Sequence, residues 1–385
     1  MWKLCASTAF VFMTKAMLTP LVPLYSLELG ASVSLVGLLV AASFVLPLFL
    51  ALPVGSLVDR RGSAPVMTAG AVLMGLAPLI IAVVPGLAAV AVAQVVAGLA
   101  HLLMGLATQS FVGSISTGVR RERDYGWYTT FASAGQLAGP LAAGLLADAL
   151  GYAAAFSAAA AISVVGVVLT RLLPDDRGRA SGSAGLGSSL LTVGTLLGRP
   201  GVRLGILASA SGIFAMTAFS AFQPTYLESL SYSATTIGML LSLKSLASMA
   251  VRPFMPGVTK LLGGKLNTLW AMMLLVAVTL GATGYFESLG PLVLLSIGFG
   301  VGFGISQPVS MVTVVEESEP GNRGFLLGLR LTGNRVAQLV GPLVIGLVAD
   351  ALGFGPAFLA GALVVVVGSF LLLLFRPRAA QALNR

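Results

Sequence analysis

Two stretches of sequence decide the fold: GQLAGPLAAGLLADALGY at residues 135–152 and AQLVGPLVIGLVADALGF at residues 337–354. Their Gly-Pro pairs and their aspartates keep one spacing, since 341 − 139 = 202 and 350 − 148 = 202. A second set of residues, near the start of each half, repeats at an offset of 201: Pro23, Tyr25, Gly37 and Gly62 match Pro224, Tyr226, Gly238 and Gly263. A repeat this long indicates two similar halves that run parallel to each other.

The composition places both halves in a membrane. Of the 385 residues, 57% are hydrophobic and 9% are charged, whereas a soluble protein carries roughly a quarter charged residues. Apolar runs of about 20 residues, the length that crosses a bilayer, follow one another almost end to end. The runs are continuous rather than alternating, which favours helices over a membrane β-barrel. The expected fold class is an all-α integral membrane protein with 12 transmembrane helices, arranged as two parallel six-helix repeats (6+6) around a central cavity.

The apolar runs give the expected spans and domains. The spans cover residues 4–25, 33–54, 66–84, 86–111, 126–148, 152–172, 204–226, 234–254, 266–285, 289–313, 325–349 and 354–375. The expected domains are an N-terminal six-helix half at residues 1–172, a flexible cytoplasmic linker at 173–203 and a C-terminal six-helix half at 204–385.

The charged residues predict the topology. Lysines and arginines gather at the termini and in alternate connections, whereas the opposite connections hold only acids: Glu28, Asp148, Glu228, Glu287 and Asp350. Basic connections stay cytoplasmic, so both termini are expected in the cytoplasm of a cell with this chain in its cytoplasmic (inner) membrane. The net charge of +9 therefore reflects topology, and nucleic acid is not an expected partner.

One motif follows the expected second helix. In GSLVDRRGSAPVM, the residues that fit the pattern G-x-L-x-D-R-x-G are Gly55, Leu57, Asp59, Arg60 and Gly62. This motif resembles the signature of the major facilitator superfamily, and the resemblance extends over the whole chain. It implies a tight cytoplasmic turn whose carboxylate meets a helix N-terminus and holds a cytoplasmic gate shut. Two further basic positions of the family are Ser63 and Ala64 here, with Arg61 as the expected substitute.

A glycine motif occupies the expected fifth helix. Its members fit G-x8-G-x3-G-P-x2-G-G, with Ala143 in place of one glycine: Gly126, Gly135, Gly139, Pro140 and Gly144. The pattern resembles that of the twelve-helix drug–proton antiporter branch of the superfamily, which implies export by antiport. The alternative is ordinary tight packing, because small residues at four-residue spacing let helices approach closely and proline bends a helix.

Four cationic or titratable residues fall near the middles of expected spans: Lys15, His101, Lys244 and Arg335. A Lys or Arg at a helix centre costs about 2.5–3.5 kcal/mol on insertion scales, so these side chains are expected to face a bundle interior or a water-filled cavity. His101 stands where the family often has arginine in helix 4. Because histidine changes protonation near physiological pH, His101 is the expected proton-coupling residue.

The acids that would balance these cations are missing from the span centres. An electropositive site favours an anionic or zwitterionic solute, and Gln223 and Gln307 are further candidates for binding it. The alternative is that Lys15 or Lys244 extends to the interface, or that Arg335 pairs with carbonyls. Other polar residues have expected structural roles: Gln136 and Gln338 as hydrogen-bond formers, Asp148 and Asp350 as gate or capping residues, and Arg252 and Arg330 as side chains that extend to the cytoplasmic interface.

The expected function is secondary active transport, with proton-coupled export (antiport) of a small organic solute or drug by alternating access. The expected partners are the small-molecule substrate, the proton and the lipid bilayer, with the chain acting as a monomer. The alternative within transport is proton-coupled uptake of an organic anion such as a monocarboxylate. A membrane enzyme or receptor is the alternative from another class, but one histidine, one cysteine and short loops argue against both. No G-x-x-x-x-G-K-[ST] motif occurs, and neither a cofactor nor a metal is expected.

Overall fold

The computed structural model describes residues 1–115, 119–174, 200–316 and 323–374 of the chain. Within these ranges every regular element is helical. Most of the expected linker, at residues 175–199, and the basic residues expected near the C-terminus, at 376, 378 and 385, lie outside the described residues.

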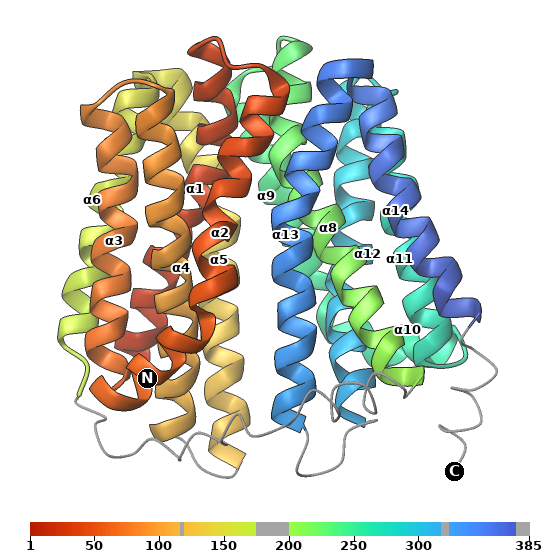
Figure 1. The fold of residues 1–385 in the computed structure, drawn as a ribbon, viewed down its shortest axis with the longest axis horizontal. Helices are drawn as coiled ribbons and strands as arrows, with labels where there is room; N and C mark the ends of the chain where they lie inside the picture. The colour runs from red at the N-terminus through yellow and green to blue at the C-terminus, as the bar shows by residue number, and fades with distance from the viewer. Residues whose placement is uncertain (116–118, 175–199, 317–322, 375–385) are drawn as a thin grey trace. The chain divides into compact units, whose positions relative to one another are not determined.

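The helices follow the predicted order (Figure 1). The first half contains α1 (Trp2–Glu28), α2 (Val33–Arg61), α3 (Ser63–Val83), α4 (Leu87–Ile115), α5 (Val119–Leu150) and α6 (Tyr152–Arg171). The second half contains α8 (Pro200–Ser229), α9 (Ala234–Val251), the 3₁₀ helix η1 (Arg252–Phe254), α10 (Met255–Leu261), α11 (Lys265–Thr283), α12 (Leu289–Glu316), α13 (Arg323–Leu352) and α14 (Phe354–Leu374). Each of the expected spans coincides with one long helix, so the all-α fold is confirmed.

The long helices suit a membrane. In the described part of the chain, 11 helices are long and apolar enough to cross a bilayer by length and composition. The remaining long helix, α5, is 32 residues long and begins with the charged stretch VRRERD at residues 119–124. Because α5 and α13 carry the two copies of the repeat, α5 is the counterpart of a helix that does meet the membrane criterion.

Helix ends differ from the expected spans for physical reasons. Several helices extend beyond their apolar runs, because a helix continues into polar residues that a hydropathy reading leaves out. The α2 helix, for example, runs to Arg61 and ends at Gly62, which has a φ of +81°. In the second half, α9 ends at Val251, although its apolar run reaches residue 254. Pro253 and Pro256 follow, and each lacks the N–H that an unbroken helix needs.

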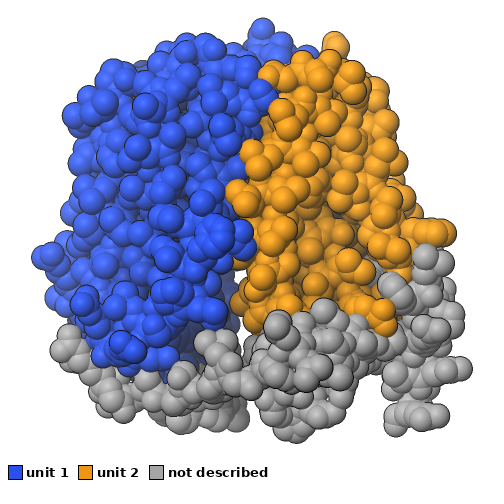
Figure 2. Space-filling view, viewed as in Figure 1, with its two compact units in different colours: residues 1–184, 223–242 blue, residues 185–222, 243–385 orange. Residues whose placement is uncertain are grey.

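The chain forms two compact units, which Figure 2 distinguishes by colour. Unit 1 comprises residues 1–184 and 223–242, and unit 2 comprises residues 185–222 and 243–385. In unit 1, α1 packs against α5 and α6, α3 packs against α4 and α6, and α2 packs against α4. In unit 2, α11 packs against α12 and α14, and α13 packs against α14. The start of α9 thus belongs to unit 1, although the sequence repeat assigns this helix to the second half.

Candidate functional site

The glycine motif of α5 lets this helix approach α1 closely. A Cβ atom at Gly139 would lie 2.6 Å from the Cβ of Ala16 and 2.7 Å from the carbonyl oxygen of Met13. A Cβ at Gly135 would overlap with the carbonyl oxygen of Ala9. Gly126, by contrast, has nothing within 4 Å of a Cβ atom built on it. The packing interpretation of the motif therefore holds for Gly135 and Gly139, and the antiport implication stays a prediction.

The same motif meets the first half of α9, within unit 1. The Oγ of Ser242 donates a hydrogen bond of 2.6 Å to the carbonyl oxygen of Leu137 and accepts one of 3.1 Å from the N–H of Leu141. In a regular α-helix these two backbone groups pair with each other. Pro140 lies between them, and a proline inside a helix leaves backbone groups to be satisfied by other partners. Ser242 supplies that partner for the proline site of α5.

Asp148 caps the N-terminus of α9. Its Oδ1 accepts a hydrogen bond of 3.1 Å from the N–H of Ala234, and its Oδ2 accepts one of 2.7 Å from the N–H of Thr235. The first N–H groups of a helix have no partner within the helix, and the helix dipole favours a negative charge there. Alongside this cap, a Cβ at Gly144 would overlap with the carbonyl oxygen of Ala234. The capping role expected for Asp148 is confirmed.

The motif expected after the second helix lies on the last two turns of α2, and only its final glycine, Gly62, forms the expected tight turn. Helix α2 ends at Arg61 and α3 begins at Ser63, so Gly62 alone connects them, with its φ of +81° in the left-handed region that favours glycine. The side chains of Asp59, Arg60 and Arg61 are exposed, and Gly55 lies half-buried two turns earlier on α2. The gating role of these residues stays a prediction.

Lys15 and His101 occupy the middles of two helices of unit 1. Lys15 is the middle residue of α1 and His101 is the middle residue of α4, and both side chains are half-buried. The imidazole of His101 meets the ring of Phe12 edge to face, with 5.2 Å between the ring centroids. Because Phe12 precedes Lys15 by three residues, both lie on one face of α1. The structure therefore brings His101 beside the face of α1 that carries Lys15.

Lys244 is a buried cation of unit 2, with 4% of its surface exposed. Its Nζ donates a hydrogen bond of 2.8 Å to the Oγ of Ser220 on α8 and lies 5.5 Å from the centroid of the Phe219 ring. That ring stacks on Phe299 of α12, with 4.2 Å between centroids. Among the described residues, no carboxylate forms an ion pair with Lys244. The ammonium thus has a hydroxyl and an aromatic face as partners.

Arg335, on α13, is half-buried and has a neutral partner. Its Nη1 donates a hydrogen bond of 3.0 Å to the Oε1 of Gln338, one turn further along the helix. Gln338 was expected to form structural hydrogen bonds, and this contact confirms that expectation. Gln223, a second binding candidate, is fully buried on the part of α8 that belongs to unit 1.

Arg330 overturns one expectation. It was predicted to extend to the cytoplasmic interface, but only 8% of its surface is exposed. Its Nη2 donates to the backbone oxygen of Gln307 at 3.2 Å, to the Oε1 of Gln307 at 3.2 Å and to the Oγ of Ser310 at 3.0 Å. The hydroxyl of Ser209 lies 3.2 Å from the same Oε1 and 2.7 Å from the Oδ1 of Asn334. These five residues, from α8, α12 and α13, are called the Arg330 cluster below.

The sequence contained only an indirect sign of this cluster. Gln307 was expected to bind the solute together with Lys244, but the structure joins it to Arg330. Gly212 makes room for it, because a Cβ at this position would lie 2.5 Å from the Nε2 of Gln307. A glycine in an apolar helix has many explanations, so its relation to a glutamine 95 positions away (307 − 212 = 95) appears only in the fold.

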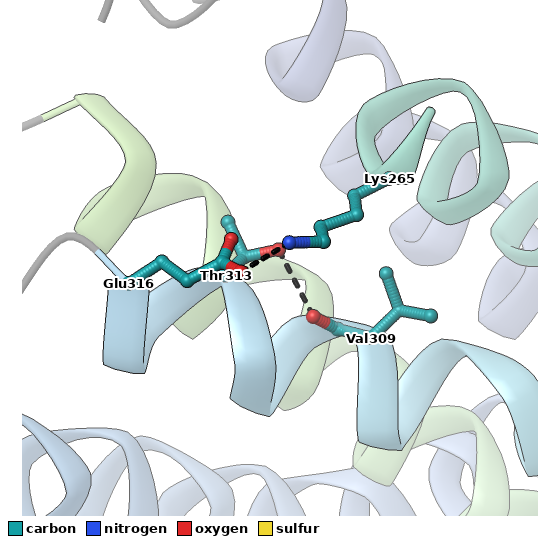
Figure 3. Close-up of polar contacts among 4 residues, drawn as sticks. All are labelled: Lys265, Val309, Thr313 and Glu316. Carbon is teal, nitrogen blue, oxygen red and sulfur yellow. Dashed lines mark hydrogen bonds and ion pairs between the residues drawn. The ribbon is translucent and has the colours of Figure 1, made fainter. Parts of the chain in front are cut away.

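Unlike the buried cations, a basic residue near a helix end of unit 2 has an acidic partner. Figure 3 shows Lys265, at the start of α11, in an ion pair with Glu316, at the end of α12, beside a hydrogen bond of 2.9 Å from Thr313 to the backbone oxygen of Val309. Both charged side chains of this pair are partly exposed, and such pairs contribute about 0–1 kcal/mol. The accessible cation therefore has a carboxylate, whereas the more deeply placed cations Lys244 and Arg330 have neutral partners.

Known transport proteins resemble this chain in sequence and in fold. The sequence profile of the Major Facilitator Superfamily matches residues 4–282 and 204–385. The quinolone resistance protein NorA of Staphylococcus aureus strain Mu50 is 22% identical over 360 residues, which cover 91% of this chain and 90% of that protein. Among solved structures, a variant of the nucleoside transporter NupG has a TM-score of 0.81 at 16% identity, covering 97% of this chain and 99% of its own. A variant of the peptide transporter POT has a TM-score of 0.79 at 15% identity, covering 99% of this chain and 94% of its own.

Proposed function

Because this chain belongs to the Major Facilitator Superfamily and is a multi-pass membrane transporter rather than an enzyme, we propose that it exports a small organic solute in exchange for protons. It works by alternating access, as a monomer in the cytoplasmic membrane with both termini in the cytoplasm. The halves at residues 1–172 and 204–385 rock against each other during the cycle. Within unit 1, Lys15, His101 and Gln223 are the proposed solute-binding residues, and within unit 2 they are Lys244 and Arg335. Gln307, also expected to bind the solute, belongs to the Arg330 cluster.

One observation carries the choice of solute. The membrane-embedded cations Lys15, Lys244, Arg330 and Arg335 have no carboxylate partner among the described residues. Every described acid lies in the first or last two turns of a helix or in a connection: Glu28, Asp59, Glu122, Asp124, Asp148, Glu228, Glu287, Glu316 and Asp350. Buried charge is costly unless it is paired. The acidic group of an anionic or zwitterionic solute supplies the missing counter-charge.

His101 is the proposed site of proton coupling. It is the one histidine of the chain, it lies at the middle of α4, and it faces the side of α1 that carries Lys15. A protonated imidazole and a bound anion attract each other. Binding of an acidic solute and protonation of His101 would therefore influence each other.

The relatives support export without naming the solute. A quinolone resistance protein matches nearly the whole chain, which favours the export of a drug-like compound. Solved structures with this fold include transporters of nucleosides and of peptides, and a shared fold does not transfer a substrate.

A thermal stability assay on the purified protein tests the proposal. Unfolding is measured with a panel of small organic anions and a matched panel of lipophilic cations, at about pH 5.5 and about pH 7.5 (about one unit on either side of a histidine's usual pKa). A ligand present at 100 times its dissociation constant adds about 2.7 kcal/mol to the stability of the folded state. Anions are expected to stabilise the wild type, and Lys244→Ala or Arg335→Ala is expected to reduce the effect. Stabilisation by lipophilic cations alone would reject the electropositive site.

Proton-coupled uptake of an organic anion, such as a monocarboxylate, is the second candidate. The cationic helix interiors favour it as strongly as they favour export, and the packing role of Gly135 and Gly139 removes the need to explain the glycine motif by antiport. Flux in proteoliposomes under an imposed pH gradient separates the two. Solute movement against the proton flux supports export, and movement with it supports uptake.

A further inference from the structure

The Arg330 cluster is separate from the surroundings of Lys244, although one helix touches both. Ser209 of α8 belongs to the cluster, and Ser220 of α8 accepts the hydrogen bond from Lys244. The two serines are 11 residues apart (220 − 209 = 11). At 1.5 Å per residue, they lie about 16 Å apart along α8. A single carboxylate cannot reach across that distance.

The guanidinium of Arg330 is incompletely bonded. All of its hydrogen bonds to the described residues come from Nη2, and all three acceptors are neutral oxygens on α12. Its Nε is buried and has no partner in the part of the chain that the structure describes. Buried polar groups nearly always have hydrogen-bond partners, so an orphaned donor on a buried cation requires an explanation. An arginine that served only to fasten α13 to α12 would be expected to use these donors as well.

We propose that the Arg330 cluster is a second anion-binding site of this transporter, which holds the carboxylate of an organic anion independently of Lys244. This inference rests on the proposed function and adds a separate site to it. The N–H of Nε can donate a charge-assisted hydrogen bond to a carboxylate oxygen while Nη2 keeps its bonds to α12, and a lysine has no second donor of this kind. The hydroxyl of Ser310 and the amide of Gln307 are neutral, so neither competes with the anion for the positive charge.

The position of the cluster sets an order of binding. Arg330 lies 7 residues from the start of α13 (330 − 323 = 7), about 10 Å along that helix. Ser209 lies 9 residues from the start of α8, whereas Ser220 lies 20 residues from it. The charge distribution predicts that both helices start at the cytoplasmic surface. An anion that enters from the cytoplasm therefore meets the Arg330 cluster before it reaches Lys244.

Calorimetric titration with sodium benzoate tests the inference. The full chain is reconstituted in nanodiscs of phosphatidylcholine, so that no anionic lipid headgroup competes, and sodium chloride keeps the ionic strength constant. The wild type is expected to bind two benzoates, and Arg330→Ala and Lys244→Ala are each expected to bind one. Arg330→Lys keeps the charge but loses the Nε donor, so affinity at this site should fall about tenfold or more, as expected for loss of a charge-assisted hydrogen bond.

Two further variants keep the test valid. Ser310→Ala leaves Arg330 in place but removes a neighbouring hydroxyl, so it should weaken one of the two binding events. This variant tests the site even if Arg330→Ala does not fold. Arg252→Ala removes an exposed arginine of the same unit and is expected to keep both sites.

The outcomes separate this inference from the proposed function. If Arg330→Ala and Ser310→Ala bind benzoate as the wild type does while Lys244→Ala loses it, the second site does not exist and the proposed function stands. If adding anionic lipid abolishes only the Arg330-dependent event, the headgroup and the benzoate compete for the same site, which supports the inference of a second anion-binding site. If benzoate does not bind to the wild type at all, the inference is rejected, and the anion panel of the stability assay decides the proposed function.

Discussion

The Nζ of Lys244 donates a hydrogen bond of 2.8 Å to the Oγ of Ser220, which joins α9 to α8 through a buried ammonium and a neutral hydroxyl. A hydroxyl compensates only part of the hydration that an ammonium loses on burial. The pair is therefore poorly balanced in the absence of a bound anion, and this imbalance has measurable consequences.

Replacing Lys244 by methionine should separate stability from binding. Methionine has similar length and no charge, so Lys244→Met is expected to leave the stability of the ligand-free protein unchanged or to raise it by about 1 kcal/mol or more. The same change should reduce stabilisation by organic anions, because only the site at Lys244 is lost. Thermal unfolding with and without the anion measures both effects.

Lys265→Met is the matched control, because Lys265 is partly exposed and pairs with Glu316. It should change stability by less than about 1 kcal/mol and keep the response to anions. A large loss of stability in Lys244→Met would mean that the buried ammonium has a structural role.

Removing the titratable group of His101 should uncouple transport from the proton gradient. His101→Gln keeps a polar side chain but cannot be protonated near neutral pH. Solute exchange between the two sides at equal pH should persist, whereas accumulation driven by a pH gradient should fall to the level without a gradient. Both are measured with radiolabelled solute in proteoliposomes. Full gradient-driven accumulation in His101→Gln would exclude this residue as the coupling site.

The glycines of α5 should differ sharply in their tolerance of a methyl group. Gly139→Ala adds a Cβ that would lie 2.6 Å from Ala16, so α1 and α5 must move apart at a cost of about 1–3 kcal/mol. Gly126→Ala adds its methyl to open space and should be neutral or slightly stabilising. Thermal unfolding of both variants tests this contrast, and equal midpoints would contradict the observed packing of α1 against α5.

Removing the carboxylate of Asp148 should destabilise the N-terminus of α9. Asp148→Ala leaves the N–H groups of Ala234 and Thr235 without their acceptors, a loss of about 1 kcal/mol, comparable to loss of an N-cap. Asp148→Asn keeps one oxygen acceptor and should lose less. Glu228→Gln changes an exposed acid at the end of α8 and serves as the control. Hydrogen exchange at the first turn of α9 should accelerate in Asp148→Ala alone.

The helical fold could be predicted from local signals, because each span needs its own apolar run and the repeat links the halves. The helix ends were predicted less accurately. The break after Val251 depends on Pro253 and Pro256, which lie within an otherwise apolar run. The turn at Gly62 was predictable, since a glycine between two helices permits the φ of +81° seen there.

The surroundings of the cations could be predicted only in part. The placement of Lys15 and His101 at helix centres follows directly from the sequence. The burial of Arg330 does not, because it depends on Gln307 and Ser310 of another helix. Distance from a helix end suggested an exposed arginine, but the side chains across the helix interface decide whether it is buried. The insertion of Ser242 at the proline site of α5 was hidden for the same reason.

Because α9 is divided between the two units, the chain should not separate into two independently stable fragments at the connection between α6 and α8. Residues 223–242 belong to unit 1 and provide Ser242 to α5 and the helix start that Asp148 caps. A fragment that ended in the connection between α6 and α8 would lack this segment, and the complementary fragment would carry it without the surface it packs on. Two such fragments, expressed from separate genes, should be unstable alone and should recover a folded protein only when they are produced together.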